Sequence, residues 1–294
     1  MAELKQDGLI GPRHQTLLQL TPFHYILQLP HLELNHSLLQ ELLVQYDNFD
    51  SSFTIAGHRL KFKSDDVALI FGLPNHGKPV KLKAIKNKDF FHRVFEKGAV
   101  SRFEIVYQLR RHGMDQSDHS VEAFVVLLLG LFISTVLAPS SNASIPASLW
   151  SYVDQLDHIC DYDWGQLVYR ELIDEIGRAK CHIAGEDADD EPSDSTYGGC
   201  FLALQLWICE IAGLGKNKKE DCSPRILGWG RNSMYGILEQ FRNLQPSDIR
   251  PPLSPRDSER HLLDNTILPS DPQPGLPSST TFQPSNLKNS VMLI

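Results

Sequence analysis

The segment GLPNHGK, residues 72–78, has the residue types and spacing of a phosphate-binding loop, G-x-x-x-x-G-K. A working loop follows a β-strand, leads into a helix, and carries a serine or threonine after the lysine that binds Mg²⁺. Here an apolar repeat with helical spacing precedes Gly72, and Pro79 follows Lys78. Proline has no hydroxyl and no N–H, and it disfavours helical geometry at the residue before it. The sequence therefore predicts a helix end and a turn at this segment rather than a nucleotide site.

The cysteine and histidine residues lack the spacing of a metal site. Cys181 and His182 are adjacent, and His158 and Cys160 are two positions apart. Neither arrangement is a zinc-finger spacing. The five cysteines are an odd number without a C-x-x-C pair, which is typical of reduced thiols in the cytosol or nucleus. We therefore predict no metal ligands.

No arrangement of nucleophile and base indicates catalysis. The chain has no G-x-S-x-G motif, and its S-x-x-K motif, Ser285 to Lys288, lies in a proline-rich tail that cannot hold catalytic geometry. No pair of acid and base residues stands out in the folded part. We therefore predict no catalytic residues, no cofactor-binding residues and no cofactor.

Basic residues are concentrated between positions 58 and 97. This segment has ten Lys/Arg and four Asp/Glu, a net charge of +6, in a chain whose net charge is −8. Such a patch can contact the phosphates of a nucleic acid, and the alternative, which we favour, is an ordinary solvated surface. The candidate contact residues are Lys81, Lys83, Lys86 and Lys88.

Large aromatic residues anchor either the core of a protein or an interface. The core is the default interpretation for all four tryptophans. Trp229 and Arg231 lie just before the last predicted helix, and they are the candidate interface residues.

Two apolar segments predict central helices. The first has 16 uncharged residues, 123–138, and then Pro139. It is shorter than the ~20 residues that cross a bilayer, so a buried core helix is the better interpretation and no membrane contact is predicted. The second, residues 200–213, is apolar nearly all round.

The remaining pattern predicts a mainly α protein: a single compact multi-helix domain with a small β-hairpin near residues 53–62. Helical periodicity recurs between residues 17 and 245, which we predict to be the domain, after a flexible segment at 1–16. Nine of the 18 prolines fall in the last 49 residues. We therefore predict a proline-rich disordered tail at 246–294.

Four segments, in order, resemble the plant mobile domain family, also called aminotransferase-like plant mobile domain. They are FTIAGHRLKFKSDDVALIFGLPNHGKPV, LLLGLFISTVLAP, YDWGQLVYRELIDEIGRA and YGGCFLALQLWICE. The resemblance covers about residues 17–250 and extends to a domain that accompanies Ulp1-type proteases in transposons. The family-signature positions are Asp66, Pro74, Trp164, Gly165, Arg170, Glu171, Gly198, Gly199, Gln205 and Trp207.

The resemblance implies a helical plant domain of transposon origin. Host members of the family are nuclear, are linked to transposon silencing, gene expression and meristem maintenance, and associate with a phosphatase-like protein. A pyridoxal phosphate enzyme would need a Schiff-base lysine, an acidic partner for the ring nitrogen and a phosphate cradle, and no such set is found in the sequence. We therefore expect a non-enzymatic nuclear domain that binds a protein partner. The alternative is a nucleic-acid-binding module that uses residues 58–97.

Overall fold

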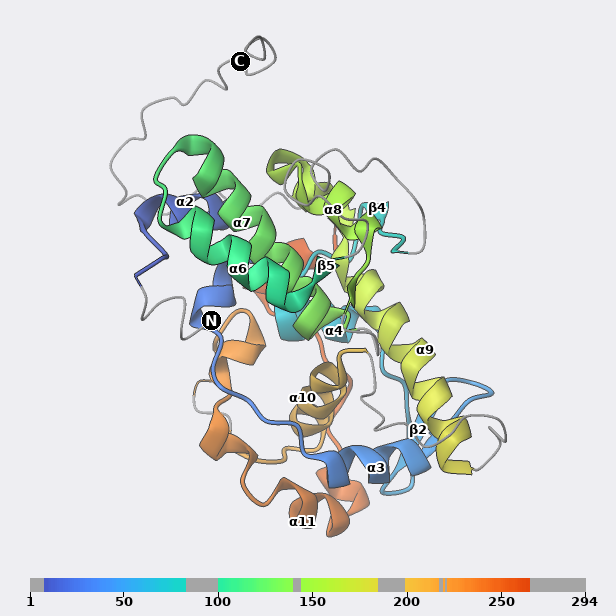
Figure 1. Cartoon of the computed structure of the whole chain (residues 1–294). Helices are drawn as coiled ribbons and strands as arrows, with labels where there is room; N and C mark the ends of the chain where they lie inside the picture. Colours follow the sequence, from blue (N-terminus) through green and yellow to red (C-terminus); the bar gives the residue numbers. More distant parts are fainter. Residues whose placement is uncertain are drawn as a thin grey trace.

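The computed structural model describes residues 8–82, 100–139, 144–184, 199–216, 219 and 221–264, and most of these residues form helices (Figure 1). The α-helices are α2 (Pro12–Gln19), α3 (His36–Val44), α4 (Ser64–Phe71), α6 (Arg102–Gly113), α7 (Asp118–Phe132), α8 (Ala147–Val153), α9 (Trp164–Ala184), α10 (Phe201–Ile211) and α11 (Ile237–Arg242). The short helical turns are η1 (His24–Gln28), η2 (Ile133–Leu137), η3 (Leu156–Asp161), η4 (Arg225–Gly228), η5 (Arg231–Met234), η6 (Pro246–Asp248) and η7 (Asp257–Leu262). The predicted mainly α fold is confirmed.

The predicted hairpin is formed by β2 (Ser52–Ile55) and β3 (His58–Leu60), which pair antiparallel. Ala56 and Gly57 connect them with φ angles of 46° and 79°. Two central residues with positive φ match the right-handed twist of the strands, which is why a glycine is favoured here. A third short strand, β1 (Tyr46–Asp47), pairs with β2 and completes the sheet.

Two further strand pairs join distant parts of the chain. β4 (Lys78–Pro79) pairs parallel with β7 (Tyr162–Asp163), and β5 (Val100–Ser101) pairs antiparallel with β6 (Ser144–Ile145). The first pair holds the 72–78 turn against the start of α9.

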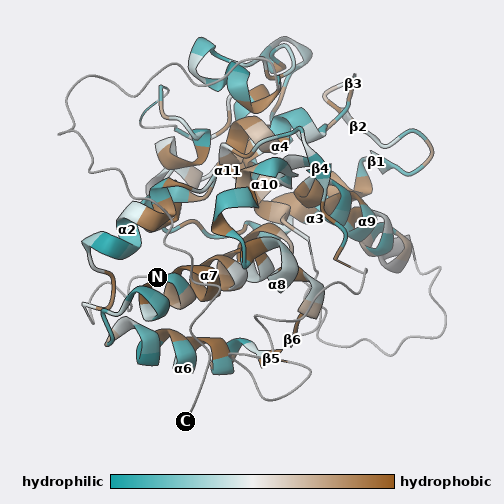
Figure 2. Ribbon diagram, turned by 90° about the horizontal axis from the view of Figure 1, so that it is seen from above, coloured by the Kyte–Doolittle hydropathy of each residue, from teal (hydrophilic) through white to brown (hydrophobic). Residues whose placement is uncertain are grey.

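Helix α7 lies at the centre of one half of the molecule, as the sequence predicts. Figure 2 shows it largely in the hydrophobic colour, between α6 and α8. A methyl group on Gly130 would lie 2.5 Å from the ring of Trp150, so only glycine allows α8 to approach this closely. Together with η2, α7 forms a 20-residue apolar helix, Asp118–Leu137, and 78% of its most apolar window is buried inside the fold. This burial is typical of a core helix.

Helix α10 is the second central helix, and nine of its eleven residues are buried. It packs against α4 and α3, and α4 in turn packs along α9. The predicted central helix at 200–213 is therefore confirmed as well.

The predicted domain boundaries need correction at both ends. At the N-terminus, α2 begins at Pro12, and the side chains of His14 and Leu18 are buried, so the flexible segment predicted at 1–16 is wrong from α2 onward. At the C-terminus, the backbone N–H of Arg250 donates to the carbonyl of Ile211 over 2.7 Å, and Leu262 is buried. Residues 246–264 therefore belong to the folded domain, and the rest of the predicted tail, 265–294, lies outside the described residues.

Candidate protein-interaction surface

The phosphate-loop pattern at residues 72–78 is a turn, as predicted. Gly72 ends α4 in the left-handed conformation, with φ 63°. Gly77 has φ 102°, and a methyl group there would lie 2.3 Å from the carbonyl oxygen of Asp161. Lys78 forms an ion pair with the carboxylate of Asp161 over 3.1 Å. The glycines thus allow the backbone conformation and the close approach that the turn requires, and the lysine adds an ion pair to the rest of the fold.

Two signature residues, Pro74 and Gly165, meet at this turn. The N–H of Gly165 donates to the carbonyl of Pro74 over 2.9 Å, and a methyl group on Gly165 would lie 2.9 Å from the side-chain oxygen of Asn75. Trp164 is fully buried and donates to the carbonyl of Ile159 over 2.7 Å. These contacts fix the beginning of α9 against the end of α4.

Arg170 and Glu171 lie further along α9. Arg170 donates to the carbonyl of Val80 over 2.8 Å and contacts the carboxylate of Glu171 at 3.6 Å. The arginine therefore holds the chain that leaves the 72–78 turn.

The signature residues Gln205 and Trp207 lie in the other half of the core. Gln205 is fully buried, accepts from the N–H of Asn35 over 2.7 Å and donates to the carbonyl of Glu33 over 3.1 Å. Both polar atoms of this buried amide are thereby paired with the backbone just before α3. Trp207 contacts Phe53 and Phe62 with ring centroids 5.4 Å apart in each case.

Gly199 has φ 74°, and its N–H donates to the carbonyl of Pro139 over 2.7 Å. Gly198 lies outside the described residues. The signature positions described so far therefore contact other parts of the fold, and none of them lines the hollow described below.

Asp66 belongs to a buried charged region between α4 and the C-terminal segment. Its carboxylate accepts the N–H of Lys63 over 2.7 Å, and burial raises its pKa to about 6. Nearby, Arg225 and Glu259 are 6% and 0% exposed and form two hydrogen bonds of 3.0 and 2.7 Å. A bidentate pair of this kind compensates the cost of burying both charges.

The described residues hold no group of three or more histidine, cysteine or acidic side chains that could bind a metal. Burial raises the pKa of the Cys200 thiol to about 12 and that of Cys209 well above its ordinary value. Both thiols are therefore uncharged and poor nucleophiles at neutral pH.

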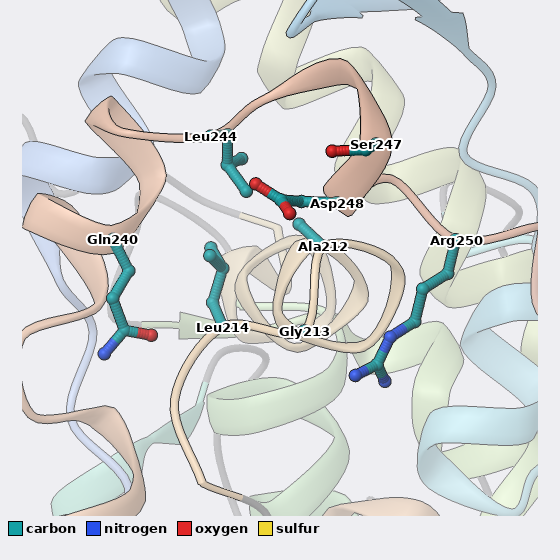
Figure 3. Close-up of a pocket in the computed structure, with 8 residues that line it drawn as sticks. All are labelled: Ala212, Gly213, Leu214, Gln240, Leu244, Ser247, Asp248 and Arg250. Atoms are coloured by element: carbon teal, nitrogen blue, oxygen red, sulfur yellow. The ribbon is translucent and has the colours of Figure 1, made fainter.

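A hollow of about 500 Å³ lies between the end of α10 and η6. Figure 3 shows the guanidinium of Arg250 directed away from the carboxylate of Asp248. Gln240 accepts the N–H of Gly215 over 2.8 Å. Because its polar groups do not converge on one point, this hollow is not a candidate ligand site.

The structure corrects the prediction that Trp229 is an interface residue. Trp229 is only 5% exposed, and its indole N–H donates to the carboxylate of Glu210 over 3.0 Å. The tryptophan is part of the core because the η4 segment folds back over the end of α10. Arg231 begins η5, and its side chain lies outside the described residues.

The predicted basic patch is described only in part. Lys81 is exposed, and its backbone N–H donates to the hydroxyl of Tyr152 over 3.1 Å. Lys83, Lys86 and Lys88 lie outside the described residues.

The surface that the sequence analysis missed is the outer side of α6. Three of the eight large apolar side chains that are exposed among the described residues lie on it or directly after it: Phe103 at 88%, Tyr107 at 67% and the C-cap residue Met114 at 75%. Arg110 is exposed between them. We call these four residues the α6 face.

The α6 face forms because α6 has two apolar rows, one on its buried inner side and one on its exposed outer side. Ile105 and Leu109 on its inner side are fully buried, and α6 makes its main contact with α7. Ser101 caps its N-terminus, accepting the N–H of Glu104 over 3.3 Å. Figure 2 shows α6 at the lower edge of the molecule. The missed signal was the second apolar row at positions 103, 107 and 114, which a search for core residues does not separate from the first.

The described residues form a helical domain that exposes a row of large apolar side chains along α6. Residues 10–205 match the family described as a domain of unknown function (DUF8566), and the chain belongs to this family. The match covers about two thirds of the chain.

Three curated proteins of Arabidopsis thaliana are also similar. Protein MAINTENANCE OF MERISTEMS is 21% identical over 74% of this chain and 48% of its own length. Protein MAIN-LIKE 1 is 23% identical over 77% and 46%, and Protein MAIN-LIKE 2 is 22% identical over 75% and 34%. The chain thus spans half or less of these relatives. They carry the plant mobile domain, which confirms the family resemblance. No solved structure matches the chain.

Proposed function

We propose that this chain is a non-enzymatic nuclear protein-interaction domain that binds its partner through the α6 face. The names of the relatives associate the family with maintenance of meristems, and we place this chain in the same process. Nuclear location, a transposon origin and a link to gene silencing are carried by the family resemblance alone. So is the phosphatase-like nuclear partner.

The observation that supports the proposal is the exposure of Phe103, Tyr107 and Met114 in one row, together with Arg110. Aromatic residues, methionine and arginine are the types enriched at protein interfaces. Isolated exposed apolar side chains need no explanation, but a contiguous row on one helix does. Full burial of each apolar side chain would contribute about 1.5–3 kcal/mol to binding.

The test compares two variants of the whole chain. In the face variant, Phe103, Tyr107 and Met114 are changed to Gln, which keeps helix propensity and removes the apolar row. In the control variant, the exposed residues Val44 and Phe49 are changed to Gln. Each protein captures partners from plant nuclear extract, and bound proteins are quantified by mass spectrometry.

We expect the face variant to lose specific partners by at least about tenfold, since one lost apolar contact of about 1.4 kcal/mol already changes affinity tenfold. The control variant should retain them. Equal capture by both variants would contradict the proposal.

The alternative is nucleic-acid binding by the basic segment 58–97, of which Lys81 is exposed. In that case, changing Lys81, Lys83, Lys86 and Lys88 to Glu would abolish binding to duplex DNA. Affinity would also fall with salt, with a log–log slope of about −0.9 for each phosphate contacted. Salt-sensitive binding that the four changes remove would favour this alternative over the α6 face.

A further inference from the structure

We propose that the α6 face is covered by the α6 face of a second copy of this chain, packed antiparallel about a two-fold axis. This inference rests on the proposed function, because it names the partner of the same surface: a second copy of the chain in place of the phosphatase-like protein that the family resemblance implies. Three properties of α6 support it: its spacing, the chemistry of the residues that would meet, and the charges beside them.

The spacing between the residues of the α6 face is the same from either end of the helix. Its residues are separated by four, three and four positions along α6. This is the spacing of a coiled-coil seam, in which two helices pack along one stripe. In an antiparallel pair centred between positions 108 and 109, Phe103 lies opposite the second copy's Met114, and Tyr107 lies opposite its Arg110.

The residue types favour this arrangement over a parallel one. Phenylalanine with methionine gives a sulfur–aromatic contact, and tyrosine with arginine gives a cation–π contact. A parallel pair in register would place Arg110 opposite Arg110, which is repulsive. The antiparallel pair places every side chain of the face against a favourable neighbour.

The flanking charges are complementary in the same geometry. Glu104 and Arg111 are seven positions apart, so they lie on the same side of the apolar row. In a pair related by a two-fold axis perpendicular to both helices, this side of one helix lies next to the same side of the other helix. Glu104 of each copy therefore faces Arg111 of the other, giving two ion pairs. The structure leaves Arg111 exposed and Glu104 half-buried.

The size of the contact sets its strength. α6 has 12 residues, and a helix pair of this length buries less than the ~1,200 Å² of a standard stable interface. We therefore expect a dimer with a dissociation constant in the micromolar range, which forms at high local concentration.

The experiment uses charge exchange in the full chain. Sedimentation velocity measures the dimer fraction between about 1 and about 100 µM, concentrations that bracket the expected micromolar dissociation constant. Glu104→Arg and Arg111→Glu, each alone, should weaken the dimer at least about tenfold, because symmetry creates two like-charge pairs. The double variant should restore wild-type affinity, because the two exchanged side chains again carry opposite charges where they face each other. Circular dichroism confirms that each variant keeps its helical fold.

The possible outcomes separate this inference from the proposed function. Restoration by the double variant supports the antiparallel pair. A wild-type chain that stays monomeric but captures nuclear partners through the α6 face overturns the second copy as partner and leaves the proposed function standing. A dimer that ignores the charge changes overturns the α6 pairing. A monomer whose nuclear capture does not depend on the face overturns both.

Discussion

Asp66 is a buried carboxylate at the third position of α4, only 4% exposed. Burial raises its pKa to about 6, against the hydrogen bond from Lys63 and the nearby positive charge of Arg225, which lower it. A raised pKa means that the folded state favours the protonated form. The contribution of Asp66 to stability is therefore fully present below the pKa of the unfolded chain, 3.8, and is lost as the pH rises to about 6.

Asp66→Asn should remove this pH dependence. The neutral amide oxygen can still accept the N–H of Lys63, while the cost of burying a charge disappears. A rise of about two pKa units corresponds to at most about 3 kcal/mol, and losing the carboxylate at the helix N-terminus costs about 0.3–1 kcal/mol. We expect the variant to be more stable than wild type by about 1–2 kcal/mol at pH 7 and to match it near pH 4.

The measurement is urea unfolding of both proteins between pH 4 and pH 8. If the two stability curves run parallel across this range, Asp66 does not titrate as its burial implies.

At the scale of elements, the 72–78 turn joins α4 to β4 and owes its shape to glycine conformations and strand pairing. Lys78 adds an ion pair with Asp161, but both side chains are well exposed, at 68% and 41%. Exposed ion pairs contribute about 0–1 kcal/mol because water screens them. The lysine is therefore a minor contributor to the turn.

Lys78→Ala should change the free energy of unfolding by less than about 1 kcal/mol. ATP and GTP should leave the melting temperature of wild type unchanged, because the turn leads into β4 and not into a helix whose N-terminus could hold phosphates. Thermal unfolding with and without each nucleotide checks both expectations. A nucleotide-induced rise in melting temperature that Lys78→Ala abolishes would show that the turn is a phosphate site after all.

At the scale of the whole molecule, residues 246–264 return to the core. The segment supplies Glu259 to the buried Arg225, and its Leu262 carbonyl accepts the N–H of Asn75 over 2.8 Å. Burial alone would raise the pKa of Glu259, but the hydrogen bonds from Arg225 and from the N–H of Arg256 bring it below its ordinary value. The carboxylate is therefore charged at neutral pH and can pair with the arginine.

Truncation should reveal this contribution. A chain ending at residue 264 keeps the pair and should retain wild-type stability. A chain ending at 245 deprives Arg225 of Glu259 and of the other contacts of the segment, and it should lose at least about 3–5 kcal/mol. Glu259→Gln in the full chain should lose a similar amount, which separates the ion pair from the other contacts of the segment. Equal stability of the 245 and 264 chains in chemical denaturation would refute this role.

Much of the fold could be predicted from local sequence. The hairpin, the helix end at Gly72 and the central helices at 123–138 and 200–213 depend on residue spacing and glycine conformation over a few positions. The family signature was also readable, since its residues recur in order. The role of these residues could not be predicted from the sequence, because Pro74 and Gly165 meet only after α4 and α9 have packed.

The sequence by itself determined the helical class, the hairpin, the 72–78 turn and the family, because each depends on neighbours along the chain or on the order of motifs. Only the tertiary structure decided which aromatic residues are exposed: Trp229 is buried, while Phe103 and Tyr107 are not. It also decided that residues 246–264 belong to the core. Exposure and burial of these residues are set by contacts with elements far away in sequence, and local periodicity carries no information about those contacts.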